Sequence, residues 1–153
     1  MLVVDLPDET ATEALASRIA AAARAADIIA LRGELGTGKT TFARAFIRAL
    51  GNLDEVPSPT FTLVQIYDAG ATAVWHFDLY RLRAPKDAWE LGIEDAFASA
   101  ISLIEWPERL GPLLPEGRLQ ISLSYGDSPG ARLASLDAGK GWQARLALIA
   151  ADA

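Results

Sequence analysis

The fold is decided by one stretch of the chain, Leu31-Arg32-Gly33-Glu34-Leu35-Gly36-Thr37-Gly38-Lys39-Thr40-Thr41. It matches the pattern G-x-x-x-x-G-K-[ST], which joins a strand to a helix. The apolar residues 28–31 ahead of it predict a buried strand. After it, Phe42, Phe46 and Leu50 recur at helical spacing, and Gly51 supplies a stop. The sequence therefore predicts a strand, a glycine-rich loop and a helix in direct succession.

The residue types in this loop are those that a phosphate group requires. Gly33, Gly36 and Gly38 allow backbone N–H groups to approach phosphates without an intervening Cβ, and the helix N-terminus adds partial positive charge. Lys39 is predicted to reach the β- and γ-phosphates, and the Thr40 hydroxyl to ligate Mg²⁺. The loop thus predicts nucleotide binding, with the candidate binding residues Glu34, Leu35, Gly36, Thr37, Gly38, Lys39, Thr40 and Thr41.

The composition is that of a folded chain with its own core. The sequence has 153 residues, 51% of them hydrophobic, and no cysteine. We expect a single domain, residues 1–153, that is held by packing alone and suits a reducing compartment. The first seven residues do not resemble a signal peptide, and no apolar run is long enough to span a bilayer. The expectation is a cytoplasmic protein without membrane contact.

The charge balance limits the kinds of partner. A net charge of −6 works against broad contact with nucleic acid, because Lys and Arg drive phosphate contacts. Two arginine pairs are candidates for a local basic patch. Arg44 and Arg48 lie one turn apart on the predicted helix, and Arg81 and Arg83 lie on one side of a segment predicted to be extended. We interpret both pairs as solvated faces.

The chain ahead of the loop predicts scaffold elements. Residues 2–6 have the pattern of a strand, and Thr10 with Glu13 predicts a capping box at the start of a helix. Leu15 and Ile19 give that helix a narrow apolar stripe.

Two interpretations stay open for the proline-rich segment that follows the second helix. Pro57 and Pro59 exclude a helix and favour an extended or turned loop. Thr60 and Thr62 then either offer a hydroxyl to a metal ion or a γ-phosphate, as in a switch loop, or begin the next strand. Spacing alone does not separate these interpretations.

A hairpin is predicted from residues 61–67 and 73–80. Alternation places His76 and Asp78 on one face of its second strand. Asp78 follows an apolar run, which is typical of a strand-end carboxylate that binds Mg²⁺ directly or through water, and the alternative is an aspartate that caps a turn. His76, the only histidine, is either a core residue or a catalytic one, and a lone histidine favours the core. The catalytic roles of His76 and Tyr80 stay open.

A second apolar strand, residues 100–104, also ends in a carboxylate, Glu105. Glu105 therefore competes with Asp78 for the metal ion, and both are tolerated because the charge of Mg²⁺ offsets their repulsion. Trp106 either packs on the nucleotide or belongs to the core, and aromatic burial favours the core.

The other segments predict peripheral elements. Residues 85–91 and 94–98 start like short helices. Residues 118–125 and 131–137 predict an antiparallel hairpin, and a final helix with one apolar face follows from Trp142 onward.

Four segments, taken in order, resemble the TsaE (YjeE) family, the ATPases of bacterial tRNA threonylcarbamoyladenosine biosynthesis. The resemblance spans roughly residues 28–110, and the conjunction is far more specific than the glycine-rich loop alone. The segments are Gly33-Glu34-Leu35-Gly36-Thr37-Gly38-Lys39-Thr40-Thr41, Ser58-Pro59-Thr60-Phe61-Thr62-Leu63-Val64, His76-Phe77-Asp78-Leu79-Tyr80-Arg81-Leu82 and Ile104-Glu105-Trp106-Pro107-Glu108.

The resemblance implies a three-layer α/β fold of the P-loop NTPase kind, with a mixed sheet whose parallel centre is flanked by antiparallel hairpins. It implies ATP and Mg²⁺ as cofactors, ATP hydrolysis, and a complex with the TsaD and TsaB proteins, through which tRNA is reached indirectly. Carried over by matching segment, the catalytic residues are Lys39, Asp78 and Glu105, the metal ligands are Thr40, Glu105 and Asp78, and Thr60 and Trp106 join the nucleotide-binding residues.

Two other functions use the same kind of loop. A small-molecule kinase would deliver the γ-phosphoryl group to a hydroxyl, but residues 51–72 are poor in the arginines that a closing lid carries. A nucleotide-dependent binding module would bind without efficient turnover. A GTPase is disfavoured by the absence of an Asn/Thr-Lys-x-Asp element that reads guanine. Extra positive charge for hydrolysis would come from Arg81 or from a partner protein.

Overall fold

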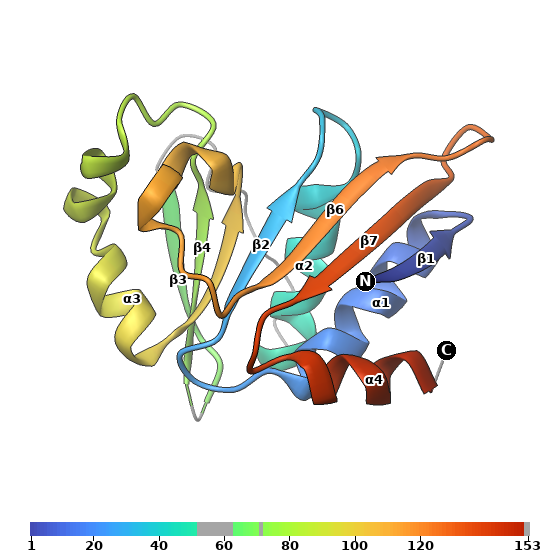
Figure 1. Ribbon diagram of the computed structural model, residues 1–153, viewed down its shortest axis with the longest axis horizontal. Coiled ribbons are helices and arrows are strands. Elements are labelled where there is room, and N and C mark those ends of the chain that lie inside the picture. Colours follow the sequence, from blue (N-terminus) through green and yellow to red (C-terminus); the bar gives the residue numbers. More distant parts are fainter. Residues whose placement is uncertain (52–62, 71, 152–153) are drawn as a thin grey trace.

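The computed structural model describes residues 1–51, 63–70 and 72–151. In this part of the chain the strands form one sheet of seven, in the order β1-β7-β6-β2-β5-β4-β3 (Figure 1). The strands are β1 (Leu2–Leu6), β2 (Ile28–Arg32), β3 (Val64–Asp68), β4 (Ala73–Asp78), β5 (Ile101–Glu105), β6 (Leu119–Tyr125) and β7 (Arg132–Ala138).

The centre of the sheet is parallel and its margins are antiparallel. β2 pairs in parallel with both β5 and β6, and β4 pairs in parallel with β5. The hairpins β3-β4 and β6-β7, and the pair β1-β7, are antiparallel. Every residue of β5 and all but the last of β2 are buried, as expected of parallel strands covered on both faces. The predicted α/β class and mixed sheet are confirmed.

Helices pack against both faces of the sheet, and the sheet separates the core into two clusters (Figure 1). Alternation within β2 sends Ile29 and Leu31 into the first cluster and Ile28 into the second. The first cluster contains α1 (Glu9–Ala22), α2 (Lys39–Gly51) and α4 (Gln143–Ala151). The second contains α3 (Ile93–Ser99) and the 3₁₀ helices η1 (Pro85–Leu91) and η2 (Pro107–Leu113).

The helix α2 is fixed against the sheet by its apolar stripe. Phe42 and Phe46 are fully buried in the first cluster, together with Ile47. Burying each aromatic side chain contributes about 1.5–3 kcal/mol. This packing holds the first turn of α2, and therefore Lys39 and Thr40, at the end of the parallel strands.

The second cluster does not extend across the whole sheet. Among the described residues it contains none from β1, β6 or β7. On that half of the sheet, Val3, Asp5 and Asp137 are exposed, and Gln120 and Ser122 are partly buried. Polar side chains on this part of β6 and β7 are therefore exposed or partly exposed to solvent.

Two local expectations are wrong. Helix α1 is capped by Asp8 and not by Thr10, because the Asp8 backbone is extended and its carboxylate accepts a hydrogen bond from the Ala11 N–H at 2.9 Å. Arg81 lies in a turn and not in an extended segment, because β4 ends at Asp78.

Thr60 and Thr62, the two threonines of the proline-rich segment, lie outside the described residues.

None of the helices in the described residues is both long enough and apolar enough to cross a membrane.

Candidate functional site

The glycine-rich loop connects the end of β2 to the start of α2 and depends on its glycines. Gly33, Gly36 and Gly38 have φ angles of 153°, 82° and 102°. A Cβ atom on Gly33 would come within 2.5 Å of the Thr37 hydroxyl and 2.7 Å of the Leu123 carbonyl oxygen. Only glycine fits that position without a shift of the neighbouring backbone.

Side chains of the loop donate hydrogen bonds to its own backbone carbonyls. The buried Thr37 hydroxyl donates to the Glu34 carbonyl at 2.8 Å. Lys39 Nζ donates to the carbonyls of Gly33 and Glu34, the second at 3.0 Å. The Lys39 ammonium is therefore held against the loop by two of the loop's own carbonyls.

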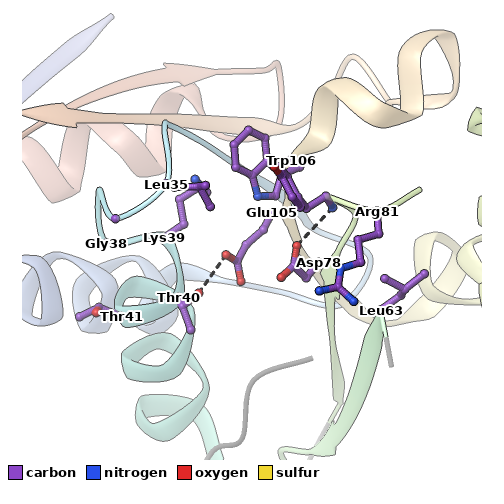
Figure 2. Close-up of a pocket in the computed structure, with 12 residues that line it drawn as sticks. Leu35, Gly38, Lys39, Thr40, Thr41, Leu63, Asp78, Arg81, Glu105 and Trp106 are labelled. Atoms are coloured by element: carbon purple, nitrogen blue, oxygen red, sulfur yellow. Dashed lines mark hydrogen bonds between the residues drawn. The ribbon is translucent and has the colours of Figure 1, made fainter. Parts of the chain in front are cut away.

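A cavity of about 440 Å³ adjoins the loop, between the first turn of α2 and the ends of β4 and β5 (Figure 2). Glu34 lines a neighbouring hollow instead, Thr37 is turned into the loop, and Thr60 lies outside the described residues. The cavity brings together most of the residues predicted from the sequence, namely Leu35, Gly36, Gly38, Lys39, Thr40, Thr41, Asp78, Glu105 and Trp106.

Glu105 lies at the centre of a chain of hydrogen bonds from three elements. Its Oε1 accepts from the Thr40 hydroxyl at 3.1 Å, and its Oε2 lies 2.7 Å from His76 Nε2. The carboxylate is 2% exposed and the histidine is fully buried. His76 is thus buried in the core, and it also orients the Glu105 carboxylate. The other oxygen of that carboxylate faces Thr40 (Figure 2).

Asp78 is brought beside Glu105 by strand register. The two residues are paired partners in the parallel ladder of β4 and β5, and both line the cavity. Burial, and then the Glu105 carboxylate, raise the pKa of Asp78. The Tyr80 N–H, which donates to Asp78 Oδ1 at 3.3 Å, and the charges of His76 and Lys39 act in the opposite direction. A cation in this cavity would offset the repulsion between the carboxylates.

Trp106 forms one wall of the cavity. Its backbone is left-handed, with φ at 60°, and its ring lies 4.1 Å from Lys39 Nζ. The Tyr80 ring lies against it, with centroids 4.9 Å apart. Burial lowers the pKa of Lys39, and the carboxylates of Glu105, Glu108 and Asp78 oppose that effect. Trp106 therefore lines the cavity as well as packing against the second cluster.

The oxygen atoms in the cavity fit Mg²⁺. Thr40 supplies a hydroxyl, and Asp78 and Glu105 supply carboxylates, all of them hard ligands. The described residues contain no cluster of three or more His, Cys, Asp or Glu side chains able to enclose an ion. A divalent ion here would need phosphate and water as further ligands, which is the usual condition of Mg²⁺ in phosphate sites.

Within the described part of the chain, Tyr125 and Arg132 contact the loop but were not predicted from the sequence. Tyr125 Oη donates to the Leu35 carbonyl at 2.5 Å, and Arg132 Nη2 donates to the Gly36 carbonyl at 3.1 Å. These residues are 90 and 96 positions from the carbonyls they contact. The pairing of β6 with β2 is the only signal that would have found them, and it is not local.

Fold and site together define an α/β protein in which a glycine-rich loop and two carboxylates converge on one cavity. The chain belongs to the TsaE family, because the model described as "Threonylcarbamoyl adenosine biosynthesis protein TsaE" matches residues 6–133. The family expected from the four sequence segments is thereby confirmed.

Named relatives agree with this family. The tRNA threonylcarbamoyladenosine biosynthesis protein TsaE of Rickettsia conorii is 39% identical over 124 residues, covering 80% of this chain and 71% of that protein. The protein of the same name from Bacillus subtilis is 39% identical over 116 residues, covering 75% and 71%. The crystal structure of Bacillus subtilis YdiB matches with a TM-score of 0.81 at 27% identity, covering 99% of this chain and 95% of that one.

Proposed function

We propose that the chain is a P-loop NTPase domain that binds ATP with Mg²⁺ and hydrolyses it. The observation that carries the proposal is the hydrogen bond between Thr40 and Glu105, which joins the loop to a strand-end carboxylate inside one cavity. Lys39 and Asp78 line the same cavity. The groups proposed to bind phosphate and metal therefore line one cavity, which supports a single nucleotide site.

The proposed roles follow from the positions of the side chains. Lys39 and the loop N–H groups bind the β- and γ-phosphates and stabilise the negative charge that develops during cleavage. Thr40 and Glu105 hold Mg²⁺, which when bound neutralises phosphate charge. Asp78, on the next strand, orients the attacking water, and Arg81 lines the cavity as a source of further positive charge.

The biological role is proposed from the family. Relatives carry the name tRNA threonylcarbamoyladenosine biosynthesis protein. We propose that this chain supports the same modification by hydrolysing ATP beside the TsaD and TsaB proteins, and that it reaches tRNA through their complex.

The first test is phosphate release from ATP by the wild-type chain and by Lys39→Ala. We expect the variant to lose about a hundredfold or more in rate, because a buried cation aimed at the reacting phosphate is removed. The matched control is Lys140→Ala, since Lys140 is exposed and lies outside the cavity. Equal rates for Lys39→Ala and wild type would refute the proposed role of the loop.

The second test is phosphate release with TsaD, TsaB and tRNA added together and separately. Stimulation of hydrolysis by the complex supports a regulated ATPase. Binding of ATP without turnover under every condition would favour a nucleotide-dependent binding module. Transfer of label from ATP to a small metabolite would favour a kinase.

A further inference from the structure

Two consecutive carbonyls of the glycine-rich loop are bound by one hairpin. Tyr125, at the end of β6, donates to the Leu35 carbonyl at 2.5 Å, and Arg132, at the start of β7, donates to the Gly36 carbonyl at 3.1 Å. Tyr125 and Arg132 are paired partners in the hairpin, and the Arg132 guanidinium lies 4.9 Å from the Tyr125 ring centroid. The two donors are therefore held together by strand pairing and by a cation–π contact.

Strand register explains why the β6-β7 hairpin reaches the loop. β6 runs parallel to β2, and Arg32, the last residue of β2, is paired with Ser122. β6 continues three residues further, about 10 Å at the usual rise of a strand. The C-terminal end of β6 consequently lies at the same end of the sheet as the loop that follows β2 (Figure 1).

The Tyr125 contact sets the direction of the Gly36 N–H. The Arg132 contact holds the next peptide, whose Thr37 N–H donates to the Glu34 carbonyl at 3.3 Å within the loop. In a planar trans peptide, the N–H of Gly36 points opposite to the Leu35 carbonyl. Holding that carbonyl toward Tyr125 directs the Gly36 N–H away from the hairpin, and Gly36 lines the cavity. A carbonyl that rotated toward a phosphate would instead repel it. Gly36 also has little room for a side chain, since a Cβ atom there would lie 3.2 Å from Tyr125 Oη.

We infer that Tyr125 and Arg132 are positioning residues that hold the glycine-rich loop in its phosphate-binding shape without touching the nucleotide. The inference rests on the proposed function, because it assumes that the loop binds phosphate. Tyr125 is 54% exposed, so its hydroxyl can be removed with little effect on the core.

The test measures dissociation constants for Mg²⁺ complexes of ADP and of inorganic pyrophosphate by calorimetry. Tyr125→Phe and Arg132→Ala should each weaken binding of both ligands about fivefold and by the same factor, as expected when each variant loses one hydrogen bond to the loop. Arg132→Lys keeps a donor and should restore most of the affinity. The matched control is Arg118→Ala, whose guanidinium bonds Pro115 and Gln120 at the opposite end of β6 and should leave both constants unchanged.

Three results would overturn the inference. Wild-type affinities in both Tyr125→Phe and Arg132→Ala would show that the hairpin does not shape the loop. A loss for ADP without a loss for pyrophosphate would show that these side chains contact the nucleoside. A folded wild-type chain that binds neither ligand would overturn the proposed function as well, and so the two failures are distinguishable. Circular dichroism melting checks folding, and Tyr125→Phe decides the test if Arg132→Ala unfolds.

Discussion

Glu105 shows how one side chain depends on groups from separate elements. Its two oxygens contact Thr40 from α2 and His76 from β4, and both Glu105 and His76 are buried. A buried carboxylate needs such partners, because an unpaired one would be costly to keep charged. The same contacts leave it aligned toward the position proposed for Mg²⁺.

Glu105→Gln is expected to raise the Mg²⁺ concentration that gives half-maximal ATP hydrolysis by about tenfold or more, because the metal loses a charged ligand. The measurement is phosphate release across a magnesium titration. Glu116→Gln is the control, since Glu116 is exposed and lies outside the cavity. An unchanged magnesium requirement in Glu105→Gln would remove Glu105 from the metal site.

Asp78→Asn is expected to lower the maximal rate by about tenfold or more with little change in the magnesium requirement, because its proposed role is to orient water. The same titration separates the two carboxylates. If Asp78→Asn instead shifts the magnesium requirement as Glu105→Gln does, Asp78 is a metal ligand.

The candidate site residues differ in how far sequence can predict them. Lys39 and Thr40 belong to a local pattern, so their neighbourhood is encoded within a few residues. Asp78 and Glu105 were predicted because each carboxylate follows an apolar run at the end of an expected strand. Their pairing across two adjacent parallel strands is seen only in the structure. Tyr125 and Arg132 carry no such pattern, and their place beside the loop depends on which strand β6 pairs with.

At the scale of a single element, the start of α1 shows how two local signals compete. Thr10 and Glu13 match a capping box, but Asp8 lies two residues earlier and takes the cap. The Asp8 carbonyl also accepts from the Thr12 N–H at 3.3 Å. The sequence pattern predicts the helix correctly but its N-cap wrongly. Asp8 and Thr10 are both good caps, and only the backbone conformation distinguishes them.

Asp8→Ala is expected to lower the free energy of unfolding by about 1 kcal/mol, the usual contribution of an N-cap. Urea denaturation followed by circular dichroism measures the change. Thr10→Ala is the matched control and should change stability by less than half as much, since Thr10 is exposed within the first turn. A larger loss in Thr10→Ala than in Asp8→Ala would contradict the observed cap.

The strands were predictable individually, but their order in the sheet was not. Apolar runs and alternation identify β2, β4 and β5, and the short connection predicts the β3-β4 hairpin. The placement of β2 between β5 and β6 depends on the packing of α2 and on pairing between distant residues. Local periodicity carries no information about such neighbours.

At the scale of the whole molecule, nucleotide binding should couple to unfolding. A ligand that binds only the folded chain stabilises it by about 2.7 kcal/mol at a hundred times its dissociation constant. For a chain of this size that corresponds to a rise of roughly 5–10 °C in the melting midpoint.

Thermal melting with Mg²⁺ and ADP is therefore expected to shift the midpoint upward, and EDTA should remove part of the shift by withdrawing the metal. Lys39→Ala should melt at the same temperature with and without ADP. A full shift in that variant would mean that ADP binds elsewhere on the molecule.

The position of β2 in the sheet also determines when the site can form during translation. Ile28 is paired with Ser102, and Ile29 with Leu119, so both neighbours of β2 are translated long after it. A nascent chain that ends after α2 contains the whole glycine-rich loop but neither adjoining strand, nor Glu105, nor the hairpin that holds Leu35 and Gly36. Affinity for phosphate should accordingly arise late on the ribosome, only once β6 and β7 have emerged and paired beside a strand that was synthesised well before them.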